Sequence, residues 1–533
     1  MAIGTVASRV TGFLRLAMLV AVLGVGEVRQ AFEVSNTLPN SLYDLLVGGV
    51  LASTLVPVLV QARAKDQDDA YVQRLLTLVL LVLTALTALA MVAAPQLVGL
   101  YSTTNDPAQL DLAVAWAWFF LPQILFYGVS ATVGAVLNTR GRFAAPVWAP
   151  VLNNVVVIAT LALFVLAPGP PAATPASLSI SQRVVLGVGT TLGVVAMTAA
   201  LLPSLRASGF RWRLRLDLRG MGLRRLGRLA AWSFLYVVAT QLAYLVLTRL
   251  ATAVDQLPQY ATAFLVWQLP YAVVAVSVLT ALLPRMSRHA VEERLDLMGH
   301  DLDQGLRLSA VLIIPAALGL VVLGQPVAVA LFAHGQTTYA QADQIGSVLA
   351  VFALGLLPFS IYQVQSRAFY ALGDTKTPAL VQVFVSTAMV LVDVAASMTL
   401  PAHARIYGLA AGLVAANCVG AAVTTSLVRR RLGSSHATGT AADAGPRHSM
   451  IFALGRMVVA GLAGAAAAAG VSAALTPFLP RDWIGAALVV ALASVADLVI
   501  YVAVMLLLGV EEVRLAIMAN ARSRRMPHND NVI

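Results

Sequence analysis

The sequence is poor in charge, in lysine and in cysteine, and each shortage narrows the class of protein. Only 11% of its 533 residues are charged and 59% are hydrophobic, whereas soluble domains carry about 25% charged residues. The chain is therefore not an ordinary soluble protein. Its single cysteine, Cys418, excludes an internal disulfide. Lysine occurs only at positions 65 and 376, so nearly all of the positive charge is arginine.

The motifs of nucleotide-driven and hydrolytic enzymes are also missing. Neither lysine follows a glycine, as the Walker A loop requires, and no His-Glu-x-x-His or Gly-x-Ser-x-Gly run occurs. We therefore expect no enzyme activity, no catalytic residue, no metal site and no cofactor. Any transport by this chain is expected to be driven by a gradient, with Na⁺ or H⁺ as the coupling ion, or by substrate supply.

The net charge of +11 invites comparison with nucleic-acid-binding proteins. The arginines, however, lie in short segments between apolar runs rather than in a folded basic domain, which is the pattern of membrane-protein loops. We expect no nucleic-acid partner.

Long apolar runs are what the chain has in abundance, for example Leu75–Ala94, Val147–Ala167 and Ile484–Leu508. Each is long enough to cross a hydrocarbon core of about 30 Å as a helix. The sequence predicts an all-α polytopic membrane protein with about 14 transmembrane helices. The expected spans are 4–26, 34–62, 71–100, 108–137, 147–167, 184–205, 229–251, 260–284, 305–323, 345–366, 378–400, 406–428, 451–476 and 484–508.

The stretch from Arg206 to Arg228 fixes the orientation of these spans, because it holds eight arginines, one aspartate and no lysine. One Arg at the centre of a bilayer costs roughly 2.5–3.5 kcal/mol on insertion scales, so this block must be a loop. If the chain crosses the membrane fourteen times, most loop arginines fall on the same side of the membrane as this block. Only four fall on the other side: Arg29, Arg183, Arg405 and Arg481. The positive-inside rule then predicts a multi-pass inner (plasma) membrane protein with both termini cytoplasmic.

An internal repeat has an offset near 231 residues. Leu38-Pro39 matches Leu269-Pro270, and the segment 141–146 matches the segment 373–378 at an offset of 232. Six spans separate each pair, so the two halves run in the same direction. This pattern predicts two parallel six-helix lobes around a central cavity, followed by two C-terminal helices, and it is typical of a transporter with alternating access.

The expected domains follow from the spans and from two segments of low complexity. They are an N-lobe at 1–205 with helices 1–6, a cytoplasmic Arg-rich loop at 206–228, a C-lobe at 229–428 with helices 7–12, a flexible cytoplasmic linker at 429–450, helices 13–14 at 451–508, and a cytoplasmic tail at 509–533.

Three arginines lie inside expected spans: Arg9 and Arg15 in the first and Arg249 in the seventh. Six positions at 100° each set Arg9 and Arg15 about 120° apart, so both can border one wide cavity. A guanidinium group matches a phosphate in a bidentate fork. We therefore expect these three residues to bind a diphosphate or similar anionic headgroup. The alternative is that the long side chains reach the membrane surface.

Asp393 lies in the middle of an expected span, in the run MVLVDVAAS. A carboxyl group at this depth is protonated, paired, or part of a cation site. We select Asp393 as the ion-coupling candidate, and pairing with an arginine or a hydroxyl is the alternative.

Helix-breaking residues in two matching spans suggest hinges. The gating positions that we expect are Pro39, Asn40, Gly48, Gly49 and Pro270. Ordinary proline kinks of membrane helices are the alternative explanation.

Several motifs extend over essentially the whole chain. They are Ser8-Arg-Val-Thr-Gly-Phe-Leu-Arg15, Gln30-Ala-Phe32, Leu38-Pro-Asn-Ser-Leu42 with Gly48-Gly49 and Val56-Pro57, Gly134-Ala-Val-Leu-Asn-Thr139 with Arg142-Phe143, and Gly373-Asp-Thr-Lys-Thr-Pro378. Together they resemble the MurJ/MviN lipid II flippases of the MOP exporter superfamily. The resemblance implies flipping of the undecaprenyl-diphosphate-linked peptidoglycan precursor, with Arg9 and Arg15 at the diphosphate. It also assigns four residues to cytoplasmic loop motifs: Asn138, Arg142, Asp374 and Lys376.

The sequence departs from this family pattern at the expected cavity. Leu16 and Gln30 stand where the family commonly has aspartate, and Tyr43-Asp44 stands where paired arginines often follow Pro-Asn. The usual arginine of the second lobe is also lost, since the segment before Pro270 reads Phe264-Leu265…Gln268, and Arg249 is its candidate substitute. The chain resembles a divergent subfamily.

Two other functions stay open at this point. One is export of another lipid-linked saccharide or amphiphile by the same fold, and the other is a non-transporting membrane scaffold in cell-wall synthesis. The expected partners are lipid II or a similar polyprenyl-diphosphate lipid, the membrane, and cell-wall synthesis proteins. The expected oligomeric state is a monomer.

Overall fold

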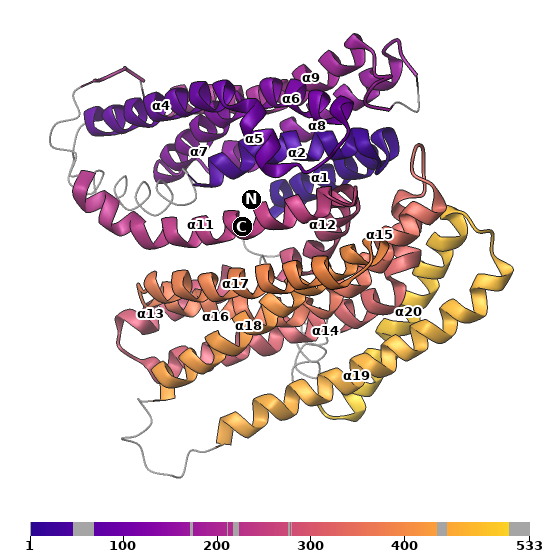
Figure 1. The fold of residues 1–533 in the computed structure, drawn as a ribbon. Coiled ribbons are helices and arrows are strands. Elements are labelled where there is room, and N and C mark those ends of the chain that lie inside the picture. The colour runs from indigo at the N-terminus through magenta and orange to yellow at the C-terminus, as the bar shows by residue number, and fades with distance from the viewer. Residues whose placement is uncertain are drawn as a thin grey trace, which may run out of the picture. The chain divides into compact units, whose positions relative to one another are not determined.

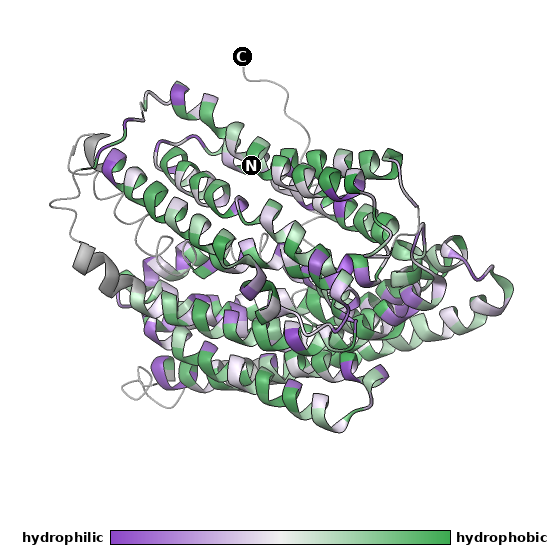
Figure 2. Ribbon diagram, turned by 45° about the horizontal axis from the view of Figure 1, so that its top comes forward, coloured by the Kyte–Doolittle hydropathy of each residue, from purple (hydrophilic) through white to green (hydrophobic). Residues whose placement is uncertain are grey.

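A computed structural model describes residues 2–45, 69–170, 174–210, 212–216, 223–274, 278, 280–433 and 445–510. Within these residues every regular element is a helix (Figure 1), and hydrophobic residues are frequent along the helices (Figure 2). Eleven helical segments are long and apolar enough to cross a membrane, or twelve if the pair α15 (Tyr339–Leu354) and α16 (Leu356–Ala371), bent by 48°, is one span. The all-α polytopic class is confirmed. The two other expected spans, 34–62 and 260–284, include residues outside the described ones.

The described residues form two compact units. Unit 1 comprises 1–262, 334–338 and 389–409, and unit 2 comprises 263–333, 339–388 and 410–533. The helices of unit 1 are α1 (Ala2–Leu23), α2 (Glu27–Tyr43), α4 (Asp69–Val92), α5 (Ala94–Tyr101), α6 (Pro107–Phe120), α7 (Gln123–Thr139), α8 (Ala144–Leu166), α9 (Ile180–Ala199), α10 (Leu201–Ala207), α11 (Leu223–Thr252) and η3 (Ala402–Ala404).

Unit 2 holds α13 (Thr280–Val291), α14 (Leu295–Phe332), α15, α16, α19 (Gly445–Leu475), η6 (Thr476–Phe478) and α20 (Trp483–Leu507). Three helices contribute residues to both units: α12 (Leu257–Val274), α17 (Lys376–Thr399) and α18 (Arg405–Gly433). The expected lobe and linker boundaries stay predictions.

In unit 1, α1 packs along α8 because the contact face of α1 carries small residues. A Cβ added at Gly4 would lie 2.6 Å from Cγ1 of Val147, so the backbones approach more closely than a larger residue would allow. Nδ2 of Asn154 on α8 donates to Oγ1 of Thr11 at 3.1 Å and to the Ser8 carbonyl at 3.3 Å. These contacts fix the rotation of α1 about its axis.

The repeat predicted at an offset of 232 is confirmed in two turns, one after α7 and one after α16. Gly141 and Gly373 both have positive φ, 74° and 72°, a conformation in which glycine is unstrained. In each turn, the residue after the glycine donates its N–H to the carbonyl of the residue five positions earlier. Arg142 donates to Leu137 and Asp374 donates to Phe369, both at 2.9 Å. This is the hydrogen-bond pattern of a glycine-ended helix, so the same motif closes the same helix in both halves.

In unit 2 the Ala- and Gly-rich helix α19 packs against α14 and α20. The backbone oxygen of Asp497 on α20 lies 2.8 Å from where a Cβ of Gly464 would stand, and the Asp497 carboxylate also faces Gly319 on α14. Asp497 is only 8% exposed. Close packing of these three helices therefore depends on glycine at both positions.

The start of α2 corrects one expectation. The sequence placed Arg29 in an external loop before a span at 34, but α2 already begins at Glu27 and Arg29 is fully buried within it. The helix starts early because Arg29 and Glu33, one turn apart, form an ion pair, with Nε of Arg29 2.8 Å from Oε1 of Glu33.

Substituting Gly464 should destabilise the fold. Gly464→Val would bring its side chain onto the Asp497 carboxylate and backbone, and overpacking of this kind costs about 1–3 kcal/mol. We expect a lower thermal unfolding midpoint for the purified protein in detergent. Gly470→Val is the matched control, because it lies on the same helix with nothing within 4 Å of its added Cβ. Equal midpoints for the two variants would show that the contact at Gly464 is not tight.

Candidate functional site

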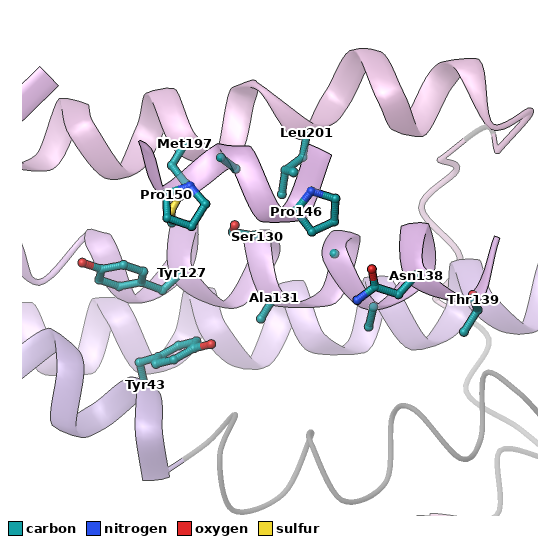
Figure 3. Close-up of a pocket in the computed structure, with 13 residues that line it drawn as sticks. Tyr43, Tyr127, Ser130, Ala131, Asn138, Thr139, Pro146, Pro150, Met197 and Leu201 are labelled. Atoms are coloured by element: carbon teal, nitrogen blue, oxygen red, sulfur yellow. The ribbon is translucent and has the colours of Figure 1, made fainter. Parts of the chain in front are cut away.

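A cavity of about 520 Å³ lies inside unit 1, between the end of α2 and helices α7, α8, α9 and α10 (Figure 3). None of its lining residues is charged. They are Tyr43, Tyr127, Ser130, Ala131, Gly134, Ala135, Asn138, Thr139, Pro146, Ala149, Pro150, Met197 and Leu201. This volume lies within the range of about 300–1,000 Å³ that is typical of small-molecule sites.

The spacing of residues along α7 explains why the cavity exists. Seven of its lining residues recur at intervals of three or four along α7, so they share one face of that helix. Three of them, Ala131, Gly134 and Ala135, are too small to fill the space toward α8. On the α8 side the wall includes Pro146 and Pro150 (Figure 3), and a Cβ added at Gly134 would still be 3.8 Å from Pro146.

Two tyrosines stand at one end of the cavity, and Asn138 and Thr139 at the other (Figure 3). The rings of Tyr43 and Tyr127 contact each other with their centroids 5.5 Å apart and tilted by 47°. Asp44, the residue after Tyr43, accepts a hydrogen bond from Nε2 of Gln241 on α11 at 3.2 Å. The positions where the family pattern has paired arginines therefore hold an aromatic wall and a solvent-exposed acid.

Arg15 lies on α1, outside the residues that line this cavity. It lies eleven residues after Gly4, about three turns, and so shares the helix face that packs against α8. The side chain is half-buried and lies within electrostatic range of Tyr127 on α7. Arg9 is exposed and lies about 120° away around α1. The part that these residues play in headgroup binding stays a prediction.

Arg249 is placed elsewhere in unit 1. Its Nη1 donates to the carbonyls of Gly99 at 3.1 Å and Leu100 at 2.8 Å, in the last turn of α5. One turn later, the Thr252 carbonyl accepts from Gln30 at the start of α2, close to where α1 ends. Arg9 lies fourteen residues before the end of α1, which is about 21 Å along the axis. The structure therefore does not bring Arg249 and Arg9 together.

A polar cluster at this end of unit 1 was missed by sequence reasoning. Besides the Arg29–Glu33 pair, Nε2 of Gln30 donates to Oδ1 of Asp255 at 2.6 Å, and Oγ1 of Thr103 donates to the Arg249 carbonyl at 2.9 Å. The i, i+4 spacing of Arg29 and Glu33 was the available signal. The cluster joins α2, α11 and the α5–α6 connection, so its first role is structural.

Asp393 lies on α17 within the part of that helix that belongs to unit 1, and it is fully buried. Neither of its carboxylate oxygens has a hydrogen-bond partner among the described residues. No group of three or more His, Cys, Asp or Glu side chains able to hold a metal is found in the described part of the chain. An unpartnered buried carboxylate is costly, so this group needs a proton or a cation.

The expected hinge residues fall on two helices. Pro39 lies inside α2 and is buried, and Nδ2 of Asn40 donates to the Asn36 carbonyl of the same helix at 2.7 Å. Pro270 lies inside α12 and is half-buried. Gly48 and Gly49 lie outside the described residues. The two described prolines are therefore kink positions, and their part in gating stays a prediction.

The loop-motif residues stabilise helix ends. Nη2 of Arg142 donates to the Ala207 carbonyl at the end of α10 at 2.7 Å, where a cation is favourable. Asp374 accepts from the Thr377 backbone at 3.0 Å and from its hydroxyl at 2.7 Å, and so caps α17. Asn138 ends α7 with an exposed side chain, and Lys376 begins α17.

The chain is similar to known proteins over most of its length. The family model described as "Lipid II flippase MurJ" matches residues 19–480. The probable lipid II flippase MurJ of Rhizobium meliloti is 28% identical over 428 residues, covering 78% of this chain and 77% of that protein. The lipid II flippase MurJ of Burkholderia cenocepacia is 28% identical over 398 residues, covering 72% and 74%.

Two solved structures show the same fold. A lipid II flippase MurJ in an inward closed conformation has a TM-score of 0.73 at 20% identity, covering 94% of this chain and 97% of that one. An inward-facing multidrug resistance MATE family transporter of the MOP superfamily has a TM-score of 0.67 at 18% identity, covering 83% and 100%. The expected family is confirmed.

The cap at Asp374 should make stability depend on pH. Burial alone would raise the pKa of Asp374, but hydrogen bonds from Thr377, the charge of Arg431 and the Lys376 backbone N–H together hold this pKa below its ordinary value. The stability that the charged cap contributes is therefore fully present above the ordinary Asp pKa of about 3.9. It is lost as the pH falls through the lower pKa of Asp374 in the folded protein.

We expect Asp374→Ala to lower the thermal unfolding midpoint at pH 7, at a cost of about 0.5–2 kcal/mol for a lost cap. The gap between variant and wild type should shrink below pH 4. Asp374→Asn is the control, because it keeps the cap and removes only the charge. A gap for Asp374→Ala that is the same at both pH values would contradict a charged cap.

Proposed function

The chain belongs to the lipid II flippase MurJ family, and from this premise we propose that it moves the undecaprenyl-diphosphate-linked peptidoglycan precursor from the inner to the outer leaflet of the cytoplasmic membrane. It is a transporter and not an enzyme. In the proposed mechanism two lobes rock about a central cavity and expose it to one side at a time. Both termini are then cytoplasmic, as the loop charges predict.

The placement of Arg15 is the observation that supports this proposal most directly. A diphosphate must be shielded while it crosses a region of low dielectric constant, and charge-assisted hydrogen bonds from guanidinium are the strong ones. Arg15 is half-buried on the packed face of α1 beside Tyr127. No carboxylate forms a salt bridge with Arg15 among the described residues, so its charge is available to an anion.

The other two arginines are assigned to different stages of transport. Arg9 lies six residues before Arg15, about 9 Å along α1, and is exposed. Arg249 uses Nη1 for two carbonyls of α5, but a guanidinium has five N–H donors. In this proposal Arg9 and Arg15 contact the diphosphate in succession, and Arg249 does so at the far end of the path.

Asp393 is the proposed coupling site. Its buried and unpartnered carboxylate binds one H⁺ or Na⁺, and release of that ion on the other side of the membrane resets the transporter. Tyr260 of the same unit lies close enough to Asp393 for the two groups to interact electrostatically. Binding of the ion removes the free-energy cost of a buried charge on Asp393. The bound ion therefore controls α17, the helix that carries this residue.

Removing the Arg15 guanidinium should weaken headgroup binding. Loss of one partner of a buried charged pair costs about 2–5 kcal/mol, and 1.4 kcal/mol is a factor of ten. Arg15→Ala should therefore weaken binding of lipid II to the purified protein by about 30-fold or more, measured by native mass spectrometry. The same variant should fail to support growth and should leave lipid II in the inner leaflet of depleted cells.

Two variants complete this test. Arg15→Lys keeps the charge but loses the fork geometry, so an intermediate loss is expected. Arg456→Ala is the control, because Arg456 also lies in a span but stacks 4.3 Å over the Phe452 ring of α19. Normal growth and lipid II export with Arg15→Ala at ordinary expression would refute the proposed role.

Neutralising Asp393 should uncouple transport from its ion. Asp393→Asn is isosteric with the protonated acid, so the protein should fold normally but lose any acceleration of lipid II flipping by a Na⁺ or pH gradient in proteoliposomes. Asp497→Asn is the matched control, since Asp497 is another buried acid within a span. Gradient dependence that survives in Asp393→Asn and disappears in Asp497→Asn would move the coupling site to α20.

A further inference from the structure

The uncharged cavity of unit 1 has no part in the diphosphate chemistry proposed above, although one of its lining residues, Tyr127, lies within electrostatic range of Arg15. We propose that this cavity is a saccharide subsite, which receives the neutral sugar next to the diphosphate of the lipid-linked precursor. The inference rests on the proposed function and deepens it, because it assigns the group that distinguishes this substrate from other polyprenyl diphosphates.

The chemistry of the lining excludes other parts of such a lipid. A phosphate or an ionised peptide would need charged partners, and the cavity lining holds none. A polyprenyl tail would bury polar groups without partners, at a cost of about 1–3 kcal/mol each. The side chains of Ser130 and Asn138 and the hydroxyls of Tyr43 and Tyr127 form no hydrogen bond with other described residues. These groups are therefore available to a ligand that is itself rich in hydroxyl and amide groups.

The aromatic wall fits the same ligand. Tyr43 and Tyr127 present tilted rings at one end of the cavity, and their hydroxyls add polar contacts at the ring edges (Figure 3). Aromatic rings with a polar end suit ligands that have one apolar and one polar face, and a sugar ring has an apolar C–H face and polar edges. Ser130, one turn after Tyr127 on α7, then contacts the edge of a sugar that lies over the tyrosines, and Asn138 lies at the other end of the cavity (Figure 3).

The position of the cavity relative to Arg15 completes the argument. Tyr127 lines the cavity and also lies within electrostatic range of Arg15 on α1. In a lipid-linked saccharide the first sugar is bonded directly to the diphosphate, so a sugar site must adjoin an anion site. Tyr127 is the residue that the uncharged cavity and the surroundings of the half-buried Arg15 have in common.

Two probes that share a tail and a diphosphate separate the sugar contacts from the charge contacts. They are lipid II and undecaprenyl diphosphate, each added to the purified full-length protein and measured by native mass spectrometry. Tyr127→Ala removes the aromatic wall, and Gly134→Leu fills the cavity from α7. Both should weaken lipid II binding at least tenfold and change undecaprenyl diphosphate binding less than twofold. Arg15→Ala should weaken both lipids.

Gly470→Leu adds the same side chain where nothing lies within 4 Å of the added Cβ, and it should bind both lipids as the wild type does. The subsite is refuted if Tyr127→Ala and Gly134→Leu bind lipid II normally, if they weaken both lipids alike, or if the wild type does not prefer lipid II. A wild type that selects lipid II through the cavity yet flips no lipid in proteoliposomes would instead overturn the proposed function and leave the subsite standing.

Discussion

A charge inside a membrane-spanning helix must find a partner, and this constraint separates the structural polar groups of unit 1 from those available for transport. Arg29 is fully buried and paired with Glu33 one turn later. Arg249 is bonded to the carbonyls that end α5, and Gln30 holds Asp255. These groups compensate one another and fix α2, α5 and α11. Arg15 and Asp393 are different, because no salt bridge neutralises either of them among the described residues. A buried carboxylate without a partner is costly, and the proposed function assigns a ligand to each of these two groups.

Much of the fold could be predicted from the sequence, because the length of apolar runs decides the helices and short glycine motifs decide their ends. The matched turns at Gly141 and Gly373 were visible as an offset of 232 and have the same hydrogen bonds. Partner choice was harder to predict. Arg249 lies in an apolar run without a nearby acid, so the sequence predicted a cation free to bind a ligand. Its partners are backbone carbonyls, which every residue has, so the sequence could not identify them. Arg29 was assigned to a loop for the opposite reason, since an isolated charge near a span end usually is in one. The cavity could not be foreseen at all, because it is defined by what Ala131, Gly134 and Ala135 do not fill.

The two halves of the repeat share their turns but not their chemistry. At the repeat offset of 231, the position of Arg15 corresponds to Val246 in the second half. The half-buried cation of the first half thus has an apolar counterpart in the second. A symmetric scaffold suits alternating access, since equivalent helices can exchange roles as the cavity changes sides. In the proposed mechanism, the asymmetry of the side chains gives the path a direction, because the diphosphate meets its strongest partner on α1.

Selectivity among lipid-linked saccharides cannot come from Arg15, because every polyprenyl diphosphate offers it the same anion. Specificity is a difference between affinities, and only groups that touch the differing part of the ligand can supply it. The family pattern has paired arginines after Pro-Asn, whereas this chain has Tyr43 against Tyr127 at the cavity and Asp44 bonded to Gln241. With tyrosine in place of arginine, this part of α2 offers shape-dependent contact instead of long-range electrostatic attraction. Positive charge attracts any anionic headgroup to the site, whereas stacking and hydrogen bonding favour only a sugar ring of matching shape. In the proposed mechanism, Arg15 therefore holds the diphosphate, while Tyr43 and Tyr127 recognise the sugar.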